Sequence, residues 1–204
     1  MPMSEVRRRL PKAVLVAIAA LAALAVLVAI AVVPRILQSD HGEPVVGGPF
    51  TLVDQTGRTV TDADFRGRLM LIFFGYTFCP DVCPMTLSTM ADAYGQLTPD
   101  QQAQVAMLFI TVDPERDTAD QMTQYVENFS PAMHGLTGSP EQIAKALRAF
   151  RVYARKVDGP DGNYTMDHSA ILYLMGKNGK FLSIFPGNAT AAEIVDGIRK
   201  HLVK

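Results

Sequence analysis

The sequence predicts an α/β domain in which helices flank a mixed sheet, preceded by an N-terminal transmembrane helix. Three observations predict this: an apolar run at 13–33, two short apolar runs at 69–75 and 105–112 that are typical of buried strands, and helix-capping signals further along the chain. The 204 residues, 49% hydrophobic and 19% charged, suit one globular domain with an appendage. A net charge of −1, without a basic patch in the domain, gives no indication of nucleic-acid binding.

The N-terminal apolar run predicts a membrane anchor. Residues 13–33 are apolar without interruption and, at a rise of 1.5 Å per residue, would form a helix about 30 Å long, enough to cross a bilayer once. The basic cluster at 7–12 favours a cytoplasmic N-terminus at 1–12, with the rest of the chain on the far side. The alternative is a cleaved secretory signal, because residues 29–31 offer an Ala-x-Ala site, but the run is longer than an ordinary signal core.

Both alternatives export the rest of the chain. The stretch before the apolar run is too short for a separate mitochondrial presequence, which favours the inner membrane of a bacterium. We therefore predict a single-pass protein whose C-terminal domain lies in the periplasm. Residues 34–48 mix Pro, Gly and polar residues and predict a linker, and residues 49–204 form the predicted domain.

The domain is predicted to alternate strands and helices. It opens with a hairpin at 50–53 and 58–61, and the run at 69–75 then predicts a central strand. The apolar spacing after Pro84 predicts a helix to about residue 96. The later elements, in order, are a strand at 105–112, a helix at 118–129, a helix from 139 to about 150, a strand at 152–157, a polar loop at 158–167, a hairpin of strands at 171–175 and 181–185, and a helix from 190 to about 202. Capping boxes open the last three helices.

The chain has only two cysteines, Cys79 and Cys83, which directly follow the predicted central strand. They could form one disulfide in an exported domain, but a bridge across so short a loop would stabilise the fold little. Backbone N–H groups and the helix dipole stabilise negative charge where a buried strand passes into a helix, and this favours thiolate over thiol. The position therefore indicates a reactive or metal-binding pair.

The spacing of the cysteines separates these two chemistries only in part. Redox enzymes commonly use Cys-x-x-Cys, whereas Cys79 and Cys83 are four positions apart and would share one face of a helical turn. Two thiolates facing one ion are soft ligands that suit Cu(I) or Zn(II). A structural zinc site would need further Cys or His nearby, and none is present. A copper site and thiol–disulfide chemistry both remain open.

Three motifs resemble one known family. They are GYTFCPDVCP at 75–84, TVDPERD at 111–117 and DHS at 167–169. In these motifs the chain is similar to the Sco/SenC proteins, which assist copper assembly of cytochrome c oxidase, and the resemblance extends over 47–203. It implies a thioredoxin-like domain that binds copper through both cysteines and the histidine of the DHS motif. By position, these metal ligands are Cys79, Cys83 and His168, and the two cysteines also form the redox pair.

Without the resemblance, His168 is a lone histidine at the end of a polar loop, a place where histidine is usually structural or solvated. Loop ends that lead into strands often carry functional groups, which favours a ligand role modestly. The resemblance favours it much more strongly.

The remaining candidates are assigned other roles. Histidines 134 and 201 are predicted to have surface or helix-end roles, and the methionines to fill the core. The aspartates beside the ligands are predicted to tune the site, and those of TVDPERD to serve turns and caps. These residues are His134 and His201; Met85, Met90 and Met166; Asp81 and Asp167; and Asp113 and Asp117.

The resemblance implies a copper metallochaperone that carries Cu(I), and in another redox state Cu(II). Its target would be the dinuclear copper centre of cytochrome c oxidase subunit II, with a periplasmic copper chaperone and a thiol reductase as further partners. One alternative is a thiol–disulfide oxidoreductase that reduces the cysteines of that subunit. Another is a thiol peroxidase, in which Cys79 would pass through sulfenic acid.

Overall fold

The computed structural model describes residues 21–23, 26–28, 46–159 and 162–202. The chain divides into two compact units, Met1–Pro44 and Val45–Lys204. Within the predicted anchor at 13–33, both described stretches are helical. The rest of the anchor, the predicted cytoplasmic segment 1–12 and most of the predicted linker lie outside the described residues. No helix among the described residues combines the length and the apolar character needed to cross a bilayer.

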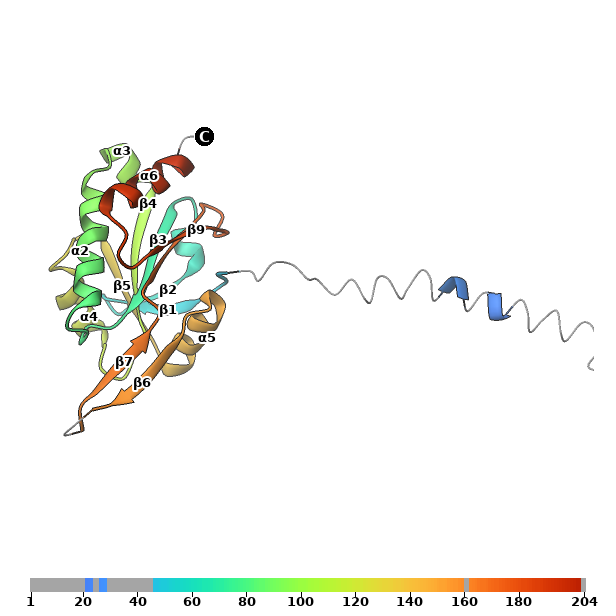
Figure 1. The fold of residues 1–204 in the computed structure, drawn as a ribbon, viewed down its shortest axis with the longest axis horizontal. Coiled ribbons are helices and arrows are strands. Elements are labelled where there is room, and N and C mark those ends of the chain that lie inside the picture. Colours follow the sequence, from blue (N-terminus) through green and yellow to red (C-terminus); the bar gives the residue numbers. More distant parts are fainter. Residues whose placement is uncertain (1–20, 24–25, 29–45, 160–161, 203–204) are drawn as a thin grey trace, which may run out of the picture. The chain divides into compact units, whose positions relative to one another are not determined.

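The second unit is built on a mixed seven-stranded sheet with the order β2-β1-β5-β4-β3-β8-β9 (Figure 1). Strands β3, β4 and β5 are parallel, whereas β1, β8 and β9 join their neighbours antiparallel. The strands are β1 (Thr51–Asp54), β2 (Thr59–Thr61), β3 (Leu69–Gly75), β4 (Val105–Thr111), β5 (Met133–Thr137), β8 (Ile171–Met175) and β9 (Phe181–Pro186). The predicted mixed sheet with flanking helices is therefore confirmed.

Three helices begin where the capping residues predict. Thr118 and Ser139 each accept a hydrogen bond from the backbone three residues on, and Thr190 does so from Glu193. The helices are η1 (Asp62–Phe65, 3₁₀), α2 (Val82–Gly95), α3 (Pro99–Gln102), α4 (Ala119–Val126), α5 (Pro140–Phe150) and α6 (Ala191–Leu202). Of these, η1 and α3 were not predicted. Helix α2 starts at Val82 rather than at Pro84, so Cys83 lies inside its first turn. Helices α2 and α6 lie side by side (Figure 1).

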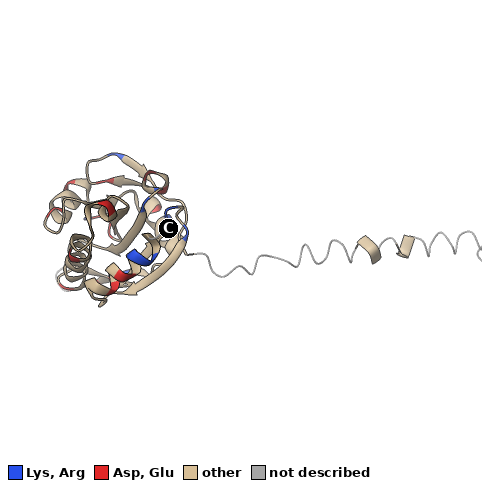
Figure 2. Cartoon of the chain, turned by 90° about the horizontal axis from the view of Figure 1, so that it is seen from above, with Lys and Arg blue, Asp and Glu red and all other residues tan. Residues whose placement is uncertain are grey.

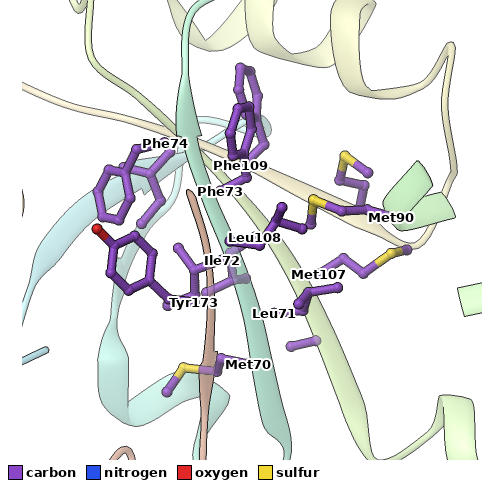
Figure 3. Close-up of a cluster of buried hydrophobic side chains, with 14 of the residues drawn as sticks. Met70, Leu71, Ile72, Phe73, Phe74, Met90, Met107, Leu108, Phe109 and Tyr173 are labelled. Carbon is purple, nitrogen blue, oxygen red and sulfur yellow. The ribbon is translucent and has the colours of Figure 1, made fainter. Parts of the chain in front are cut away.

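The core surrounds the two central strands. Every residue of β3 and β4 is buried, as expected for parallel strands covered on both faces. Their side chains pack against Met90 of α2 and Tyr173 of β8, and the rings of Phe73 and Phe109 stack with centroids 6.2 Å apart (Figure 3). Both cysteines lie beyond the C-terminal end of β3, because they follow that strand in the chain.

The polar stretch at 158–167, predicted as a loop, instead contributes to a second, two-stranded sheet. Strands β6 (Ala154–Asp158) and β7 (Tyr164–His168) pair antiparallel, with Ala154 opposite His168. Strand β6 agrees with the strand predicted at 152–157, whereas the loop prediction was wrong for β7 because that strand contains few apolar residues. Along β7, Tyr164, Met166 and His168 alternate with more exposed residues and share its half-buried face. Figure 1 shows this hairpin projecting from the rest of the domain.

Charged residues of both signs are spread over several elements of the described domain (Figure 2). The ion pairs among the described residues are Arg58–Asp54, Arg66–Asp62, Arg116–Asp113, Arg155–Asp167 and Lys156–Glu115. Only Asp54 and Asp113 among the paired carboxylates are almost fully buried, with side chains 4% and 3% exposed. Exposed ion pairs contribute about 0–1 kcal/mol to the free energy of unfolding, so the pairs of Asp54 and Asp113 are the ones expected to stabilise the fold.

Asp54 gives the domain a defined pH dependence. Burial raises the pKa of its carboxyl group, but hydrogen bonds from Thr56 and Arg58 outweigh this and lower the pKa to about 2. A depressed pKa contributes stability above the ordinary value of 3.8, which is lost as the pH falls towards 2. We expect Asp54→Asn to be less stable than wild type in urea at pH 7, with the gap narrowing at pH 3. A gap that stays constant between these pH values would contradict the assignment.

Candidate metal centre

The two cysteines lie in the turn between β3 and α2. Cys79 is half-buried, whereas Cys83 is fully buried against the core. The backbone N–H of Cys83 donates to the Cys79 sulfur at 3.4 Å, so the first turn of α2 directs a donor at that sulfur. This is the environment at a helix N-terminus that favours thiolate.

His168 approaches the cysteines from the end of β7. Its ring packs edge-on against Phe73 and Tyr76, with centroids 6.0 and 5.8 Å away. Nδ1 lies 3.2 Å from the carbonyl oxygen of Ser169, and Nε2 lies 3.5 Å from the Cys83 sulfur. Because a carbonyl can only accept, Nδ1 carries the proton of the neutral ring, and the Nε2 lone pair is left free towards Cys83.

The structure brings Cys79, Cys83 and His168 into one cluster. Their two sulfur atoms and one ring nitrogen all lie within 4.8 Å of one another. Zinc–sulfur and zinc–nitrogen bonds are about 2.0–2.3 Å long, so three donors spaced evenly around one ion of that size lie about 3.5–4.0 Å apart. The three donors therefore fit around a single ion with little movement. Two sulfurs and an imidazole are a donor set suited to Cu(I).

The two thiols differ in acidity. A hydrogen bond from the Cys83 thiol lowers the pKa of Cys79 to about 3, and the nearby His168 ring acts in the same direction. The same bond to Cys79, together with burial, raises the pKa of Cys83. The reduced pair thus holds a thiolate on Cys79 and a thiol on Cys83. Binding an ion through both sulfurs must release the Cys83 proton.

Asp117, assigned by its sequence to a turn or cap, instead supports the cysteine turn. Its carboxylate accepts hydrogen bonds from the backbone and hydroxyl of Thr77, at 3.0 and 2.6 Å, and from the Thr111 hydroxyl at 2.6 Å. Burial raises its pKa. Sequence reasoning missed this role because Thr77 is 40 residues away. The sequence signal for this role was that the TVDPERD motif contains two aspartates, Asp113 and Asp117.

The other predicted residues have mixed outcomes. Met90 is buried in the core and His201 is exposed in the last turn of α6, as predicted. The core assignment of Met85 is wrong, since its side chain is 66% exposed on α2. The surface role of His134 is also wrong, because β5 lies inside the sheet and the His134 ring packs half-buried against Phe65. Asp167 pairs with Arg155 at the surface.

Gly75 provides the space in which the Cys83 sulfur lies. A Cβ at Gly75 would meet that sulfur at 2.8 Å and the ring of Phe109 at 2.9 Å. We expect Gly75→Ala to destabilise the domain by about 1–3 kcal/mol in urea unfolding, because an overpacked core must shift. Gly95→Ala is the matched control, since nothing lies within 4 Å of a Cβ there. Equal stability of the two variants would contradict the packing described.

Fold and cluster together define a thioredoxin-like domain that presents two thiols and one imidazole at the end of its central strand. A sequence profile of the SCO1/SenC family matches residues 38–203, most of the chain. The chain therefore belongs to the SCO1/SenC family, as its three motifs predict.

Known proteins show the same likeness. The human mitochondrial SCO1 homolog is 42% identical over 169 residues, which cover 79% of this chain and 54% of the human protein. The structure of Bradyrhizobium japonicum ScoI, solved with copper bound, has 45% identity and a TM-score of 0.72, covering 76% of this chain and 99% of ScoI. BsSco, a member of the Sco family of cytochrome c oxidase assembly proteins in which a disulfide switch was identified, has 26% identity and a TM-score of 0.63, covering 80% and 97%. The chain spans about half the length of the curated relatives it matches.

Proposed function

We propose that this chain is a copper metallochaperone that binds copper through Cys79, Cys83 and His168. The observation that carries the proposal is the convergence of their three donor atoms within 4.8 Å. The likeness to ScoI with copper bound supports the choice of metal. The likeness to a member of a cytochrome c oxidase assembly family supports the purpose, which we propose to be assembly of the dinuclear copper centre of subunit II.

Copper is the cargo in this proposal, and the chain's side chains set how it is held and released. Thiolates favour Cu(I), and the neutral imidazole also suits Cu(II). Cys83 is fully buried, whereas Cys79 is half-buried and is therefore the ligand that an acceptor can reach. An incoming thiolate can then bind before the donor sulfurs leave, so that the metal passes without being released into solution.

The proposed location follows from the N-terminal sequence. We propose that residues 13–33 anchor the chain once in a bacterial inner membrane, with 1–12 in the cytoplasm. The linker at 34–48 would then lead to a copper-binding domain at 49–204 in the periplasm. Oxidising conditions there convert dithiols to disulfides, so a thiol reductase must keep the pair open before copper can bind.

Direct transfer tests this function. The full chain, purified in detergent and loaded with Cu(I), is mixed with the copper-free, reduced soluble domain of subunit II in the presence of excess Cu(I) chelator. We expect the acceptor to gain copper despite the chelator, and copper presented as the chelator complex alone to transfer far less. Copper remaining on the chain, or passing only into the chelator, would contradict the proposal.

The unequal exposure of the cysteines supports a second candidate, thiol–disulfide exchange. Cys79 would attack a disulfide of the acceptor, forming a mixed disulfide and expelling one acceptor thiolate. Cys83 would then attack Cys79, leaving a Cys79–Cys83 disulfide and a fully reduced acceptor. Two results would favour this reaction over metal transfer. The Cys83→Ser variant would form a stable mixed disulfide with the acceptor. The His168→Ala variant, expressed in cells that lack the wild-type chain, would restore the copper content of the oxidase.

A further inference from the structure

We infer that residues 113–117, here called the clasp, set the position of His168 relative to the two cysteines. The inference rests on the proposed metal site. One end of the clasp, Asp117, holds the cysteine turn through Thr77, as described above. The other end, Asp113 and Arg116, holds the hairpin that carries His168. A single short segment thus contacts both halves of a site whose ligands are far apart in the sequence.

The contacts of the clasp with the hairpin centre on Tyr164. The Tyr164 hydroxyl donates to Asp113 Oδ1 at 2.8 Å, and Arg116 Nη1 donates to the Tyr164 carbonyl at 3.0 Å. Arg116 Nε donates to the second oxygen of Asp113, which closes a partly buried network. The guanidinium carbon also lies 3.6 Å from the centroid of the Tyr164 ring. Both the backbone and the side chain of Tyr164 are therefore fixed to the clasp.

Arg116 also contacts the cysteine side of the site. Its guanidinium carbon lies 4.7 Å from the ring centroid of Phe78, the neighbour of Cys79, and 5.7 Å from that of Tyr76, whose ring packs against His168. Its Nη2 is buried and has no hydrogen-bond partner among the described residues. The faces of the surrounding aromatic rings interact with the guanidinium group instead of an oxygen acceptor. Arg116 is thus packed between the cysteine turn and the hairpin.

The hairpin depends on such contacts because it does not pair with the seven-stranded sheet. Tyr164 and His168 lie on the same half-buried face of β7, at its two ends. At its base the hairpin is tied by hydrogen bonds between Tyr153 and Ser169. With the base tied and Tyr164 held by the clasp, β7 has one orientation, and that orientation points His168 at Cys83.

An ion pair also joins the clasp to the hairpin and supplies the control. Lys156 of β6 binds Glu115 of the clasp at 2.9 Å, but the two side chains are 45% and 63% exposed. The side chains of Arg116 and Asp113 are only 22% and 3% exposed. The Lys156 ammonium also lies 3.8 Å from the centroid of the Tyr164 ring, but its hydrogen bond goes to Glu115 and not to Tyr164. Because exposed pairs contribute little, removing Lys156 should leave His168 in place, whereas removing Arg116 should not.

The test measures the Cu(I) affinity of the full chain in detergent by chelator competition. We expect Arg116→Gln to weaken binding by about ten- to a hundredfold, as typically follows loss of a residue that orients a metal ligand. Lys156→Gln should change affinity less than about twofold. His168→Ala should cost much less in the Arg116→Gln chain than in wild type, no more than about threefold, because the imidazole is already displaced. The nitrogen coupling of His168 in the electron paramagnetic resonance spectrum of the Cu(II) form should disappear in Arg116→Gln.

Several results would overturn the inference. Unchanged affinity in Arg116→Gln would do so, as would losses from Arg116→Gln and His168→Ala that simply multiply, because a purely structural role predicts independence. If circular dichroism shows that Arg116→Gln does not fold, the Cu(I) affinity of Tyr164→Phe tests the inference instead, because this substitution removes only the hydroxyl bound to Asp113. We expect it to weaken binding about threefold, and no change would overturn the clasp. No effect of His168→Ala in wild type would instead refute the proposed ligand set, and the clasp with it.

Discussion

Replacing Cys83 with serine is expected to weaken Cu(I) binding by about a hundredfold or more. Structural zinc sites with four ligands are worth about 10–16 kcal/mol, so one ligand contributes on the order of 3 kcal/mol, about a factor of a hundred in affinity. The sulfur of Cys83 is fully buried and lies 3.5 Å from His168 Nε2. A serine hydroxyl there is a hard and neutral donor that Cu(I) binds poorly.

Met85→Leu is the matched control for this loss. Met85 also carries sulfur on α2, but its side chain is exposed rather than packed against the core. We expect its removal to leave the affinity, measured by chelator competition, unchanged. A large loss in Met85→Leu, or an undiminished affinity in Cys83→Ser, would contradict the donor set of two thiols and one imidazole.

Replacing Phe109 with alanine is expected to destabilise the domain by about 3–5 kcal/mol. The side chain is fully buried in β4, and its ring contacts those of Phe73 and Tyr125 with centroids 6.2 and 5.6 Å away. Removing it leaves a cavity in the core beside Gly75, next to which the Cys83 sulfur also lies. The change in unfolding free energy would be measured by urea titration followed by far-ultraviolet circular dichroism.

Phe181→Ala removes the same side chain from edge strand β9, where it is 40% exposed. We expect it to cost less than about 1 kcal/mol, because surface substitutions rarely cost more. Comparable losses for the two phenylalanines would show that β4 does not form the centre of the core as described.

The central strands and helix starts were predictable because their signals are local. The runs at 69–75 and 105–112 are apolar throughout, since both faces of β3 and β4 are covered. Capping residues mark the helices because they satisfy backbone groups within the same turn. Strand β6 was predicted at 152–157, but its partner β7 was assigned to a loop because its residues are mostly polar and alternate ones are exposed. Strand β5 was missed because Gly135 and His134 interrupt its apolar pattern.

The site was predictable only in part. The spacing of Cys79 and Cys83 reveals a pair that shares one helical turn, because both residues belong to one local element. His168 is 85 residues from Cys83, and only the family resemblance connected them. The contacts of Asp117 and Arg116 arise from tertiary packing between distant segments. Their residue types fit ordinary turns equally well, so sequence alone could not assign them to the site.

Copper content of the reduced chain tests the central claim most directly. The full chain in detergent, its cysteines kept reduced, is titrated with Cu(I) and the bound metal is measured after chelator competition. We predict about one copper per chain for wild type and for His201→Ala, which removes an exposed imidazole from α6. His168→Ala, with both cysteines intact, should bind copper much more weakly. Affinity in His168→Ala equal to that of wild type would contradict a three-ligand copper site.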